Sequence, residues 1–463
     1  MRYLLRLLLA AMVAMLLPHA AFAQTTEWRE LRTRSFAILY AAGDEATAQT
    51  YAGFADAIYD ETSAIFGHQV ATPISLRLYP TWDSYVAVNP LAAGLQGIVA
   101  HADYQRHEVV VVVSQTARQS ETEVQNNVRH ELTHIVASDL SGNRLNVLFQ
   151  EGIAQYVEHA APELETRVSL LRRAVANDAL MRWSDLDDRQ MFYDHSEVSY
   201  PQSLSITAFL IEKYTFATFR SFLTTSASST GYRSALERTY GMPADQLEKA
   251  WRDWLPEYLA GGYRRNAISA YDLSHAQQLL GEARYTEAAD ELTQALAWLR
   301  TTDQSAVAGQ AEALLERAKQ GQQALALASD ARAKLEAGDY AGAALATQQA
   351  QQAYAGLGDT MQDAVLGEYA ARASRGQAAQ SALDQAGALA DGLRYPEARA
   401  AADRAAAEFA ALGNSASAQQ ALLMRATLDQ YQSWLGLGLL VLGALGVMAS
   451  IWRRLAVVEA DAW

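Results

Sequence analysis

Apolar residues in the first part of the chain repeat with two different periods. Alternating or β-branched apolar residues at 35–40 and 74–79, and five consecutive valines within 108–114, predict three strands. Apolar residues spaced three and four positions apart predict helices at 45–66, 121–138, 147–159 and 203–214. The order strand, helix, strand, strand and then helices predicts an α+β domain, which we place at residues 24–263.

The next stretch, residues 268–430, is rich in alanine, glutamine, leucine and arginine, and predicts an all-α region. Tyr285, Tyr340 and Tyr395 are separated by steps of 55 residues, which indicates a helical repeat region of three units. We expect about three helices in each unit. The start of the second unit, Gly338 to Ala343, resembles the opening of a tetratricopeptide helix pair. Such a region either binds a protein partner or forms a stalk, and both interpretations stay open.

The N-terminal segment, residues 1–23, is predicted to be a secretory signal peptide. Arg2 and Arg6 precede an apolar run, and Ala21 and Ala23 supply the small residues of a cleavage site. An uncleaved N-terminal anchor is the alternative, although the run is short for a bilayer. Cleavage would place the mature N-terminus outside the cytoplasm.

A second apolar segment, residues 433–452, is predicted to be a transmembrane helix. It is uncharged, is flanked by Trp434 and Trp452, and is long enough to cross a bilayer; a buried core helix is the alternative. Arg453 and Arg454 follow directly, so the tail 453–463 is predicted to be cytoplasmic. The chain would then cross the cytoplasmic membrane once, with its domains on the extracytoplasmic side.

Charge and cysteine content narrow the possible chemistry. A formal net charge of −15 argues against nucleic acid as a partner, because binding a phosphate backbone requires a concentrated basic surface. The chain contains no cysteine, which excludes disulfides, thiolate metal sites and a thiol nucleophile. A metal ion would have to be held by histidine and carboxylate side chains.

One motif has the spacing of a metal site. In His130-Glu131-Leu132-Thr133-His134 the two histidines stand four residues apart, so both imidazoles lie on one face of a helix and can reach the same ion. Ser120 and Glu123 form a capping box that predicts where this helix begins. The metzincin pattern is excluded, because Ala137 and Leu140 stand where it requires glycine and histidine.

The next predicted helix contains Phe149-Gln150-Glu151-Gly152-Ile153-Ala154-Gln155-Tyr156. Together with the histidine motif, this segment resembles the gluzincins, and specifically the peptidase MA-like domain family. In that family a glutamate followed by glycine, a small residue and tyrosine completes the metal site. The resemblance implies a zincin-like α+β catalytic domain with Glu151 as the third ligand. Gln155 is expected either to hold a ligand imidazole or to be a solvated polar residue.

The resemblance also implies a reaction and its residues. Three protein ligands on Zn²⁺ leave one position for a water molecule, whose pKa zinc lowers to about 7, and Glu131 would act as its general base. Tyr200 begins a tyrosine-x-glutamine-serine segment similar to one in peptidase MA-like proteins, which implies that it stabilises the oxyanion; Tyr193 competes for this role. His159 is an alternative ligand.

The valine-rich strand lies just before the metal helix. In resembling folds an edge strand at this place pairs with the substrate backbone, whereas five valines are more typical of a buried central strand. The leading hypothesis is a membrane-anchored extracytoplasmic zinc metallopeptidase acting on a peptide or protein, either as an endopeptidase or as an exopeptidase. The alternative is a catalytically silent cell-envelope protein that binds a partner through its repeats and holds a structural metal.

Overall fold

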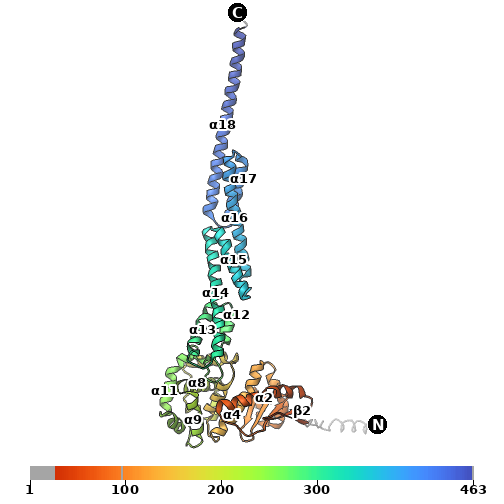
Figure 1. Cartoon of the computed structure of the whole chain (residues 1–463), viewed down its shortest axis with the longest axis vertical. Helices are drawn as coiled ribbons and strands as arrows, with labels where there is room; N and C mark the ends of the chain where they lie inside the picture. The colour runs from red at the N-terminus through yellow and green to blue at the C-terminus, as the bar shows by residue number, and fades with distance from the viewer. Residues whose placement is uncertain (1–26, 95–96, 461–463) are drawn as a thin grey trace, which may run out of the picture. The chain divides into compact units, whose positions relative to one another are not determined.

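The computed structural model describes residues 27–94 and 97–460, and the chain divides into two compact units, Met1–Ser274 and His275–Trp463 (Figure 1). The predicted signal peptide, residues 1–23, lies outside the described residues. We describe each unit by itself.

The first unit contains a five-stranded sheet with the order β1-β2-β3-β5-β4. Its central strands β2, β3 and β5 are parallel, and the two edge strands β1 and β4 are antiparallel to their neighbours. The strands are β1 (Trp28–Arg32), β2 (Phe36–Ala41), β3 (Ile74–Tyr79), β4 (Ala100–Asp103) and β5 (Glu108–Val112). The sequence predicted β2, β3 and β5 but missed both edge strands, which are short and carry few large apolar residues.

The valine-rich strand β5 lies between β3 and β4, so the suggestion that it is the edge strand is wrong. Its side chains alternate between two cores. Val109 and Val111 belong to the main core, together with residues of the helices, while Val110 and Val112 pack with Tyr79 on the opposite face. Burial on both faces accounts for the continuous run of valines.

Helices make up the rest of the first unit. Helices α2 and α4 pack against each other beside the sheet (Figure 1). Helix α2 contacts β2, α4 contacts β4 and β5, and α5 packs against α8. The helices are α2 (Glu45–Phe66), α3 (Trp82–Val88), α4 (Glu121–Leu140), α5 (Val147–Val157), α6 (Glu163–Ala176), α7 (Arg189–Asp194), α8 (Ser196–Tyr214), α9 (Phe216–Ser226), α10 (Tyr232–Tyr240) and α11 (Ala244–Leu259), with the 3₁₀ turns η1 (Pro90–Gly94), η2 (Val113–Thr116) and η3 (Gly262–Arg264). This arrangement agrees with the predicted α+β class.

Glu212 on α8 is a buried carboxyl group outside the histidine motif. Within the described part of the chain its Oε1 has no hydrogen-bond partner, and its Oε2 lies 3.8 Å from a guanidinium nitrogen of Arg265. Burial raises the pKa of Glu212 to about 7, although Arg265 acts in the opposite direction. The folded protein therefore favours the neutral form of this side chain.

The second unit is built from helices alone in its described residues, and each 55-residue period holds two helices rather than the three expected. A shorter helix is followed by a long one: α13 (Tyr285–Leu299) and α14 (Ser305–Ala337), α15 (Tyr340–Leu357) and α16 (Asp363–Asp391), α17 (Tyr395–Ala411) and α18 (Ser415–Ala460), preceded by α12 (Ser274–Gly281). The expectation of three was wrong because each long helix continues without a break.

The tyrosines of the first two periods pack in the same way, each on the long helix of its own period. A Cβ atom at Gly321 would lie 2.1 Å from the ring of Tyr285, and one at Gly376 would lie 2.1 Å from the ring of Tyr340. Each ring therefore occupies the space that a side chain on the following long helix would fill. Tyr340 is further fixed by a hydrogen bond from Asn414 to its hydroxyl (3.1 Å).

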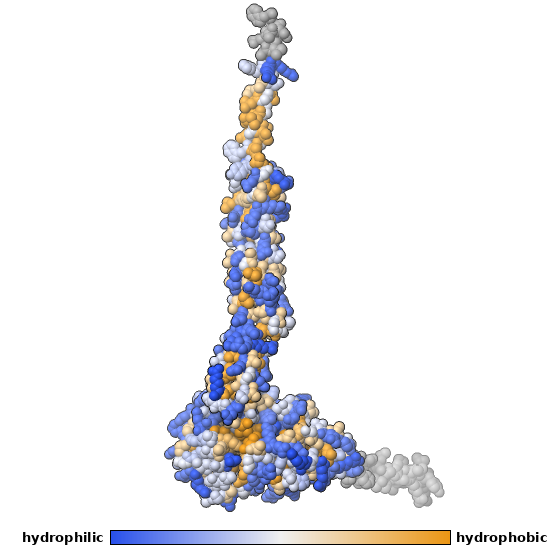
Figure 2. All heavy atoms as spheres, viewed as in Figure 1, coloured by the Kyte–Doolittle hydropathy of each residue, from blue (hydrophilic) through white to orange (hydrophobic). Residues whose placement is uncertain are grey.

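Helix α18 continues from the last unit into the C-terminal apolar segment. Among the described residues it is the one helix long and apolar enough to cross a membrane, with a candidate span in Ser415–Arg454. None of that apolar window is buried in the protein, and Figure 2 shows it as a hydrophobic band. This exposure argues against the alternative of a buried core helix.

Candidate metal centre

The histidine motif lies on α4, which begins and is oriented as the sequence predicts. Ser120 accepts a hydrogen bond from the Glu123 amide, and Glu123 accepts one from the Ser120 amide, so the capping box is present. The imidazole rings of His130 and His134 lie one turn apart, with centroids 4.7 Å apart and planes at 84°. The opposite face of α4 packs in the main core of the unit.

Helix α5 brings Glu151 to the two histidines. Its Oε2 lies 3.4 Å from Nε2 of His130 and 3.7 Å from Nε2 of His134. These three residues form a group whose possible ligand atoms all lie within 4.8 Å of one another. The structure therefore brings together the three residues predicted to bind metal.

The group fits a divalent cation. Glu151 Oε2 is buried, and within the described residues no hydrogen bond of ordinary geometry satisfies it. An unsatisfied buried carboxylate oxygen is costly unless a cation is bound. Tetrahedral bonds of 2.0–2.1 Å to zinc separate ligand atoms by about 3.3 Å, close to the 3.4 and 3.7 Å found here. His130, His134 and Glu151 could thus hold a metal ion.

Each candidate ligand is oriented by a second side chain. His130 Nδ1 lies 2.7 Å from Oε1 of Glu158, and His134 Nδ1 lies 3.3 Å from Oε1 of Gln150. The Tyr193 hydroxyl donates to Oε1 of Glu151 at 3.1 Å. Because the Nδ1 atoms are engaged in this way, the Nε2 atoms of both histidines face Oε2 of Glu151.

Both expectations for Gln155 are wrong, because its side chain is buried and, within the described residues, makes no hydrogen bond to either imidazole. Its amide nitrogen donates to the backbone oxygens of Glu151 and Tyr200 and to Ser203 Oγ. Since α5 packs on α8 along this side, Gln155 links the two helices. Glu158 holds the imidazole of His130 instead. It follows Glu151 by seven residues, which places it on the same helical face, and this spacing could have indicated its role in the sequence.

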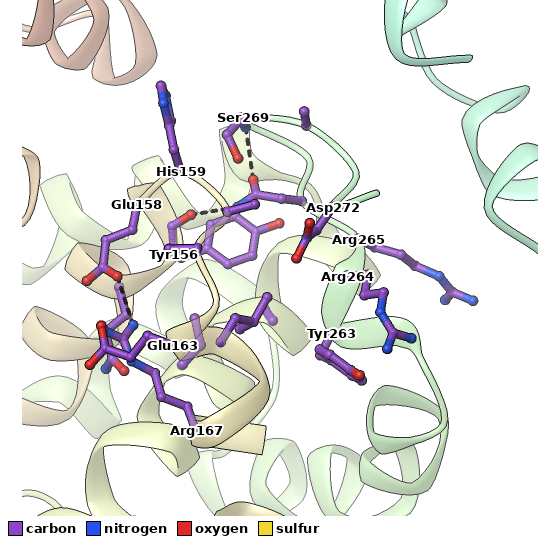
Figure 3. Close-up of a pocket in the computed structure, with 18 of the residues that line it drawn as sticks. Tyr156, Glu158, His159, Glu163, Arg167, Tyr263, Arg264, Arg265, Ser269 and Asp272 are labelled. Atoms are coloured by element: carbon purple, nitrogen blue, oxygen red, sulfur yellow. Dashed lines mark hydrogen bonds and ion pairs between the residues drawn. The ribbon is translucent and has the colours of Figure 1, made fainter. Parts of the chain in front are cut away.

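Glu158 is in turn fixed by an ion pair. Arg167 on α6 donates to its Oε2 at 2.8 Å, and both side chains line a pocket that is partly open to solvent (Figure 3). None of the three candidate ligands lines this pocket. The pocket therefore lies behind the metal group, on the side of the orienting residues.

Charges around the group favour a cation. Glu151 and Glu158 raise the pKa of His130 to about 10, although burial opposes this shift. Burial lowers the pKa of His134 to about 4. The pKa of Glu151 is held low despite its burial by the neighbouring imidazoles and Tyr193. Anionic carboxylates thus stand beside the neutral imidazole of His134, and a metal ion bound here would take the place of the proton on His130.

Glu131 occupies the position expected of a general base. It is adjacent to the first histidine on α4, and its carboxylate lies near the backbone amide of Ala102 on edge strand β4. Burial first, and then the charges of Glu151 and Glu158, raise its pKa to about 7, whereas His130 acts in the opposite direction. Such a carboxyl group can exchange a proton near neutral pH.

Three tyrosines stand around the group. Tyr200 packs against Tyr193, with ring centroids 6.4 Å apart, and burial together with Glu151 raises the pKa of both. Tyr104, which the sequence did not single out, contacts His134 at 5.7 Å between ring centroids, and its pKa is raised to about 12, mainly by burial. Both predicted tyrosines therefore lie beside the candidate ligands.

His159 is not a ligand of this group. Its Nε2 lies 2.6 Å from Oε1 of Glu61, and Glu61 also binds Arg129. The chain turns away from the metal group after α5 ends at Val157, which carries His159 toward α2.

Comparison with known families finds one match, in the first unit. Residues 56–257 match the family model of the Peptidase MA superfamily, and all three candidate ligands lie within the match. This supports an MA-clan peptidase-like domain in this part of the chain. No curated protein matches the chain significantly.

Proposed function

We propose that this protein is a zinc metallopeptidase of the gluzincin type, anchored in the cytoplasmic membrane with its catalytic domain on the extracytoplasmic side. The convergence of His130, His134 and Glu151 on one point, with Oε2 of Glu151 unsatisfied, carries the proposal. The Peptidase MA superfamily match supports a peptidase as the class of enzyme. A zincin-like fold of the first unit belongs to the same proposal.

The proposed chemistry assigns separate roles to the residues. When bound, a zinc ion would act as a Lewis acid on the substrate carbonyl and would make a water molecule acidic enough to react near neutral pH. Glu131 takes the proton of the attacking water and passes it to the leaving amine, which its pKa near 7 favours. The nearby Ala102 amide favours the ionised form of Glu131, which is the form that accepts a proton.

Tyr200 is our candidate for stabilising the oxyanion. The Tyr193 hydroxyl is already engaged with Glu151, so Tyr193 is better suited to orient that ligand. For the Tyr200 hydroxyl no hydrogen bond is found among residues 27–94 and 97–460, which leaves it available to a substrate oxygen. A phenol that stays protonated at neutral pH can donate to a developing negative charge.

The edge strand β4 is our candidate for holding the substrate backbone. It pairs with β5 on one side, and the backbone of Ala102 reaches Glu131. An extended peptide pairing with the open edge of β4 would lie beside the general base. The sequence analysis considered the valine-rich strand for this role, but β4 is the strand at the edge of the sheet.

The membrane anchor and its orientation rest on α18. Its apolar window is uncovered, and Arg453 and Arg454 follow it, so the positive-inside rule favours a cytoplasmic tail. With a cleaved signal peptide at 1–23, both compact units would lie outside. The repeats would then either bind a protein partner or raise the catalytic unit above the membrane.

The test is peptide hydrolysis by the full chain in lipid nanodiscs. We expect cleavage of a peptide library that stops on addition of a chelator, returns with Zn²⁺, and falls by at least about 10³-fold in Glu131→Gln. Full activity in Glu131→Gln would refute the assigned base. An intact metal content without any hydrolysis, and with a protein captured by residues 268–430, would favour the silent interaction protein.

A further inference from the structure

The third repeat unit departs from the first two at two positions. At the turn before each short helix, positions 283, 338 and 393 all have positive φ, but the residues are Ala283, Gly338 and Leu393. Leucine is unfavourable in this conformation, because its side chain crowds the backbone. Leu393 is nevertheless 67% exposed, so packing within the protein does not account for it.

The second departure is at the socket for the periodic tyrosine. In the first two units a glycine stands 36 residues after the tyrosine and makes room for its ring. In the third unit this position is Tyr431, which is exposed and lies against Tyr395 with ring centroids 6.4 Å apart. Two large side chains thus stand at the surface where the other units bury one ring.

Both departures lie at the same level of the molecule. Helices α17 and α18 are antiparallel: Asp403 pairs with Arg425, Arg399 pairs with Asp429, and Tyr395 contacts Tyr431. A residue with a lower number on α17 therefore lies opposite a residue with a higher number on α18. Continuing this register brings the turn at Leu393 to the level of Trp434, the first residue of the apolar run.

That level is where the proposed membrane would begin. Tyr431 precedes Trp434 by three residues on one continuous helix, a rise of about 4.5 Å. The headgroup layer on each side of a bilayer is about 5–8 Å thick. Aromatic side chains favour this layer, and Trp434 is itself 69% exposed.

We propose that Leu393, Tyr395 and Tyr431 form a lipid-contacting edge, by which the third repeat unit sits in the headgroup layer of the membrane. The inference rests on the proposed membrane anchoring by α18. It adds a second contact with lipid, since the turn between α16 and α17 would insert Leu393 while the tyrosines face the interface. The third unit would then be held upright on the bilayer by two elements.

The absence of cysteine from the chain permits a direct test. The full chain is reconstituted in phosphatidylcholine vesicles, with a single cysteine carrying an environment-sensitive fluorophore at position 393. Leu345→Cys on α15 is the matched control, because Leu345 is also an exposed leucine (56%) in the repeats. Leu345 lies close to Tyr340, which accepts a hydrogen bond from Asn414. Asn414 is 17 residues before Tyr431, so this part of the repeats lies farther from the apolar run than Leu393 does. Leu440→Cys, within the apolar run, reports on the anchor itself.

Quenching by nitroxide lipid and by aqueous iodide separates the outcomes. We expect the label in Leu393→Cys to be quenched by lipid and protected from iodide, as in Leu440→Cys, and the label in Leu345→Cys to show the reverse. Lipid quenching at 440 with iodide quenching at 393 would overturn the lipid-contacting edge and leave the anchor intact. Protection of 393 from both quenchers would indicate a protein contact and would also overturn it. Iodide quenching at 440 would overturn the anchor and the edge together.

Discussion

Replacement of Gly152 by alanine tests how closely α5 must approach α8 for the metal group to form. A Cβ at this position would lie 2.2 Å from Thr207 Oγ1 and 2.6 Å from the carbonyl oxygen of Ser203. The Thr207 hydroxyl can rotate away, but the carbonyl belongs to the backbone of α8. An ordinary contact is at least about 3.4 Å, so the two helices must separate by about 0.8 Å.

The cost follows from this displacement. Overpacking of a buried contact destabilises a protein by up to about 3 kcal/mol, whereas the higher helix propensity of alanine stabilises it by about 1 kcal/mol. The free energy of unfolding should therefore fall by about 2 kcal/mol. For a unit of this size we expect the melting temperature to fall by about 4–8 °C. Because Glu151 precedes Gly152 directly, we also expect metal affinity to fall by about 10-fold or more.

The assay pairs thermal unfolding with competition against a zinc indicator dye. Gly53→Ala is the matched control, because Gly53 lies within α2 and a Cβ there would have no neighbour within 4 Å. We expect this control to be stabilised by about 0.5–1 kcal/mol with unchanged metal affinity. A Gly152→Ala variant as stable as Gly53→Ala, with normal metal affinity, would refute the close packing of α5 on α8.

Three further substitutions test other parts of the structure. Glu158→Gln removes the charge that holds His130 Nδ1, so we expect metal affinity to fall by about 10–100-fold in a dye competition assay. Glu212→Gln should raise the free energy of unfolding by about 1–3 kcal/mol near pH 8 and by little near pH 4. The native carboxyl, with its pKa raised to about 7, lowers stability as pH rises from its unfolded pKa to 7, and denaturant titrations at the two pH values measure the difference. Gly376→Ala should lower the free energy of unfolding of the helical repeats by about 1–3 kcal/mol, because its Cβ would overlap the Tyr340 ring. Thermal unfolding measures this change.

Each of these has a control in the same region. Glu163 also pairs with Arg167 but is more exposed, so Glu163→Gln should leave metal affinity unchanged; an equal loss in both variants would contradict the orienting role of Glu158. Glu257, the other carboxylate near Arg265, is half-exposed, and Glu257→Gln should lack the gain at high pH. Gly367 on α16 has no neighbour within 4 Å of a Cβ, so Gly367→Ala should be neutral or stabilising.

The metal group was predictable because its residues are tied to helices by local rules. Four-residue spacing fixed His130 and His134 on one face, and the capping box fixed where α4 begins. Glu151 required the family resemblance, since spacing alone does not say which carboxylate returns to the histidines. The structure now places its Oε2 within 3.7 Å of both imidazoles.

The partners of the ligands depend on tertiary packing and were harder to predict. Gln155 lies on α5 and Glu158 directly follows its last residue, but Gln155 binds to α8 whereas Glu158 pairs with Arg167 on α6. Edge strand β4 was missed because its four residues include two alanines and two polar residues, so their apolar content was too low to indicate a strand. The 55-residue period was visible, whereas the unbroken length of α14 and α16 was not.

The most direct measurement of the central claim is the metal content of the purified full chain. We expect about one zinc ion per chain by mass spectrometry of the element, retained in Glu131→Gln and lost in Glu151→Gln, because Glu151 supplies a ligand oxygen and Glu131 does not. A Glu151→Gln variant that keeps its full metal content, or a wild-type chain that retains no divalent ion, would contradict the account.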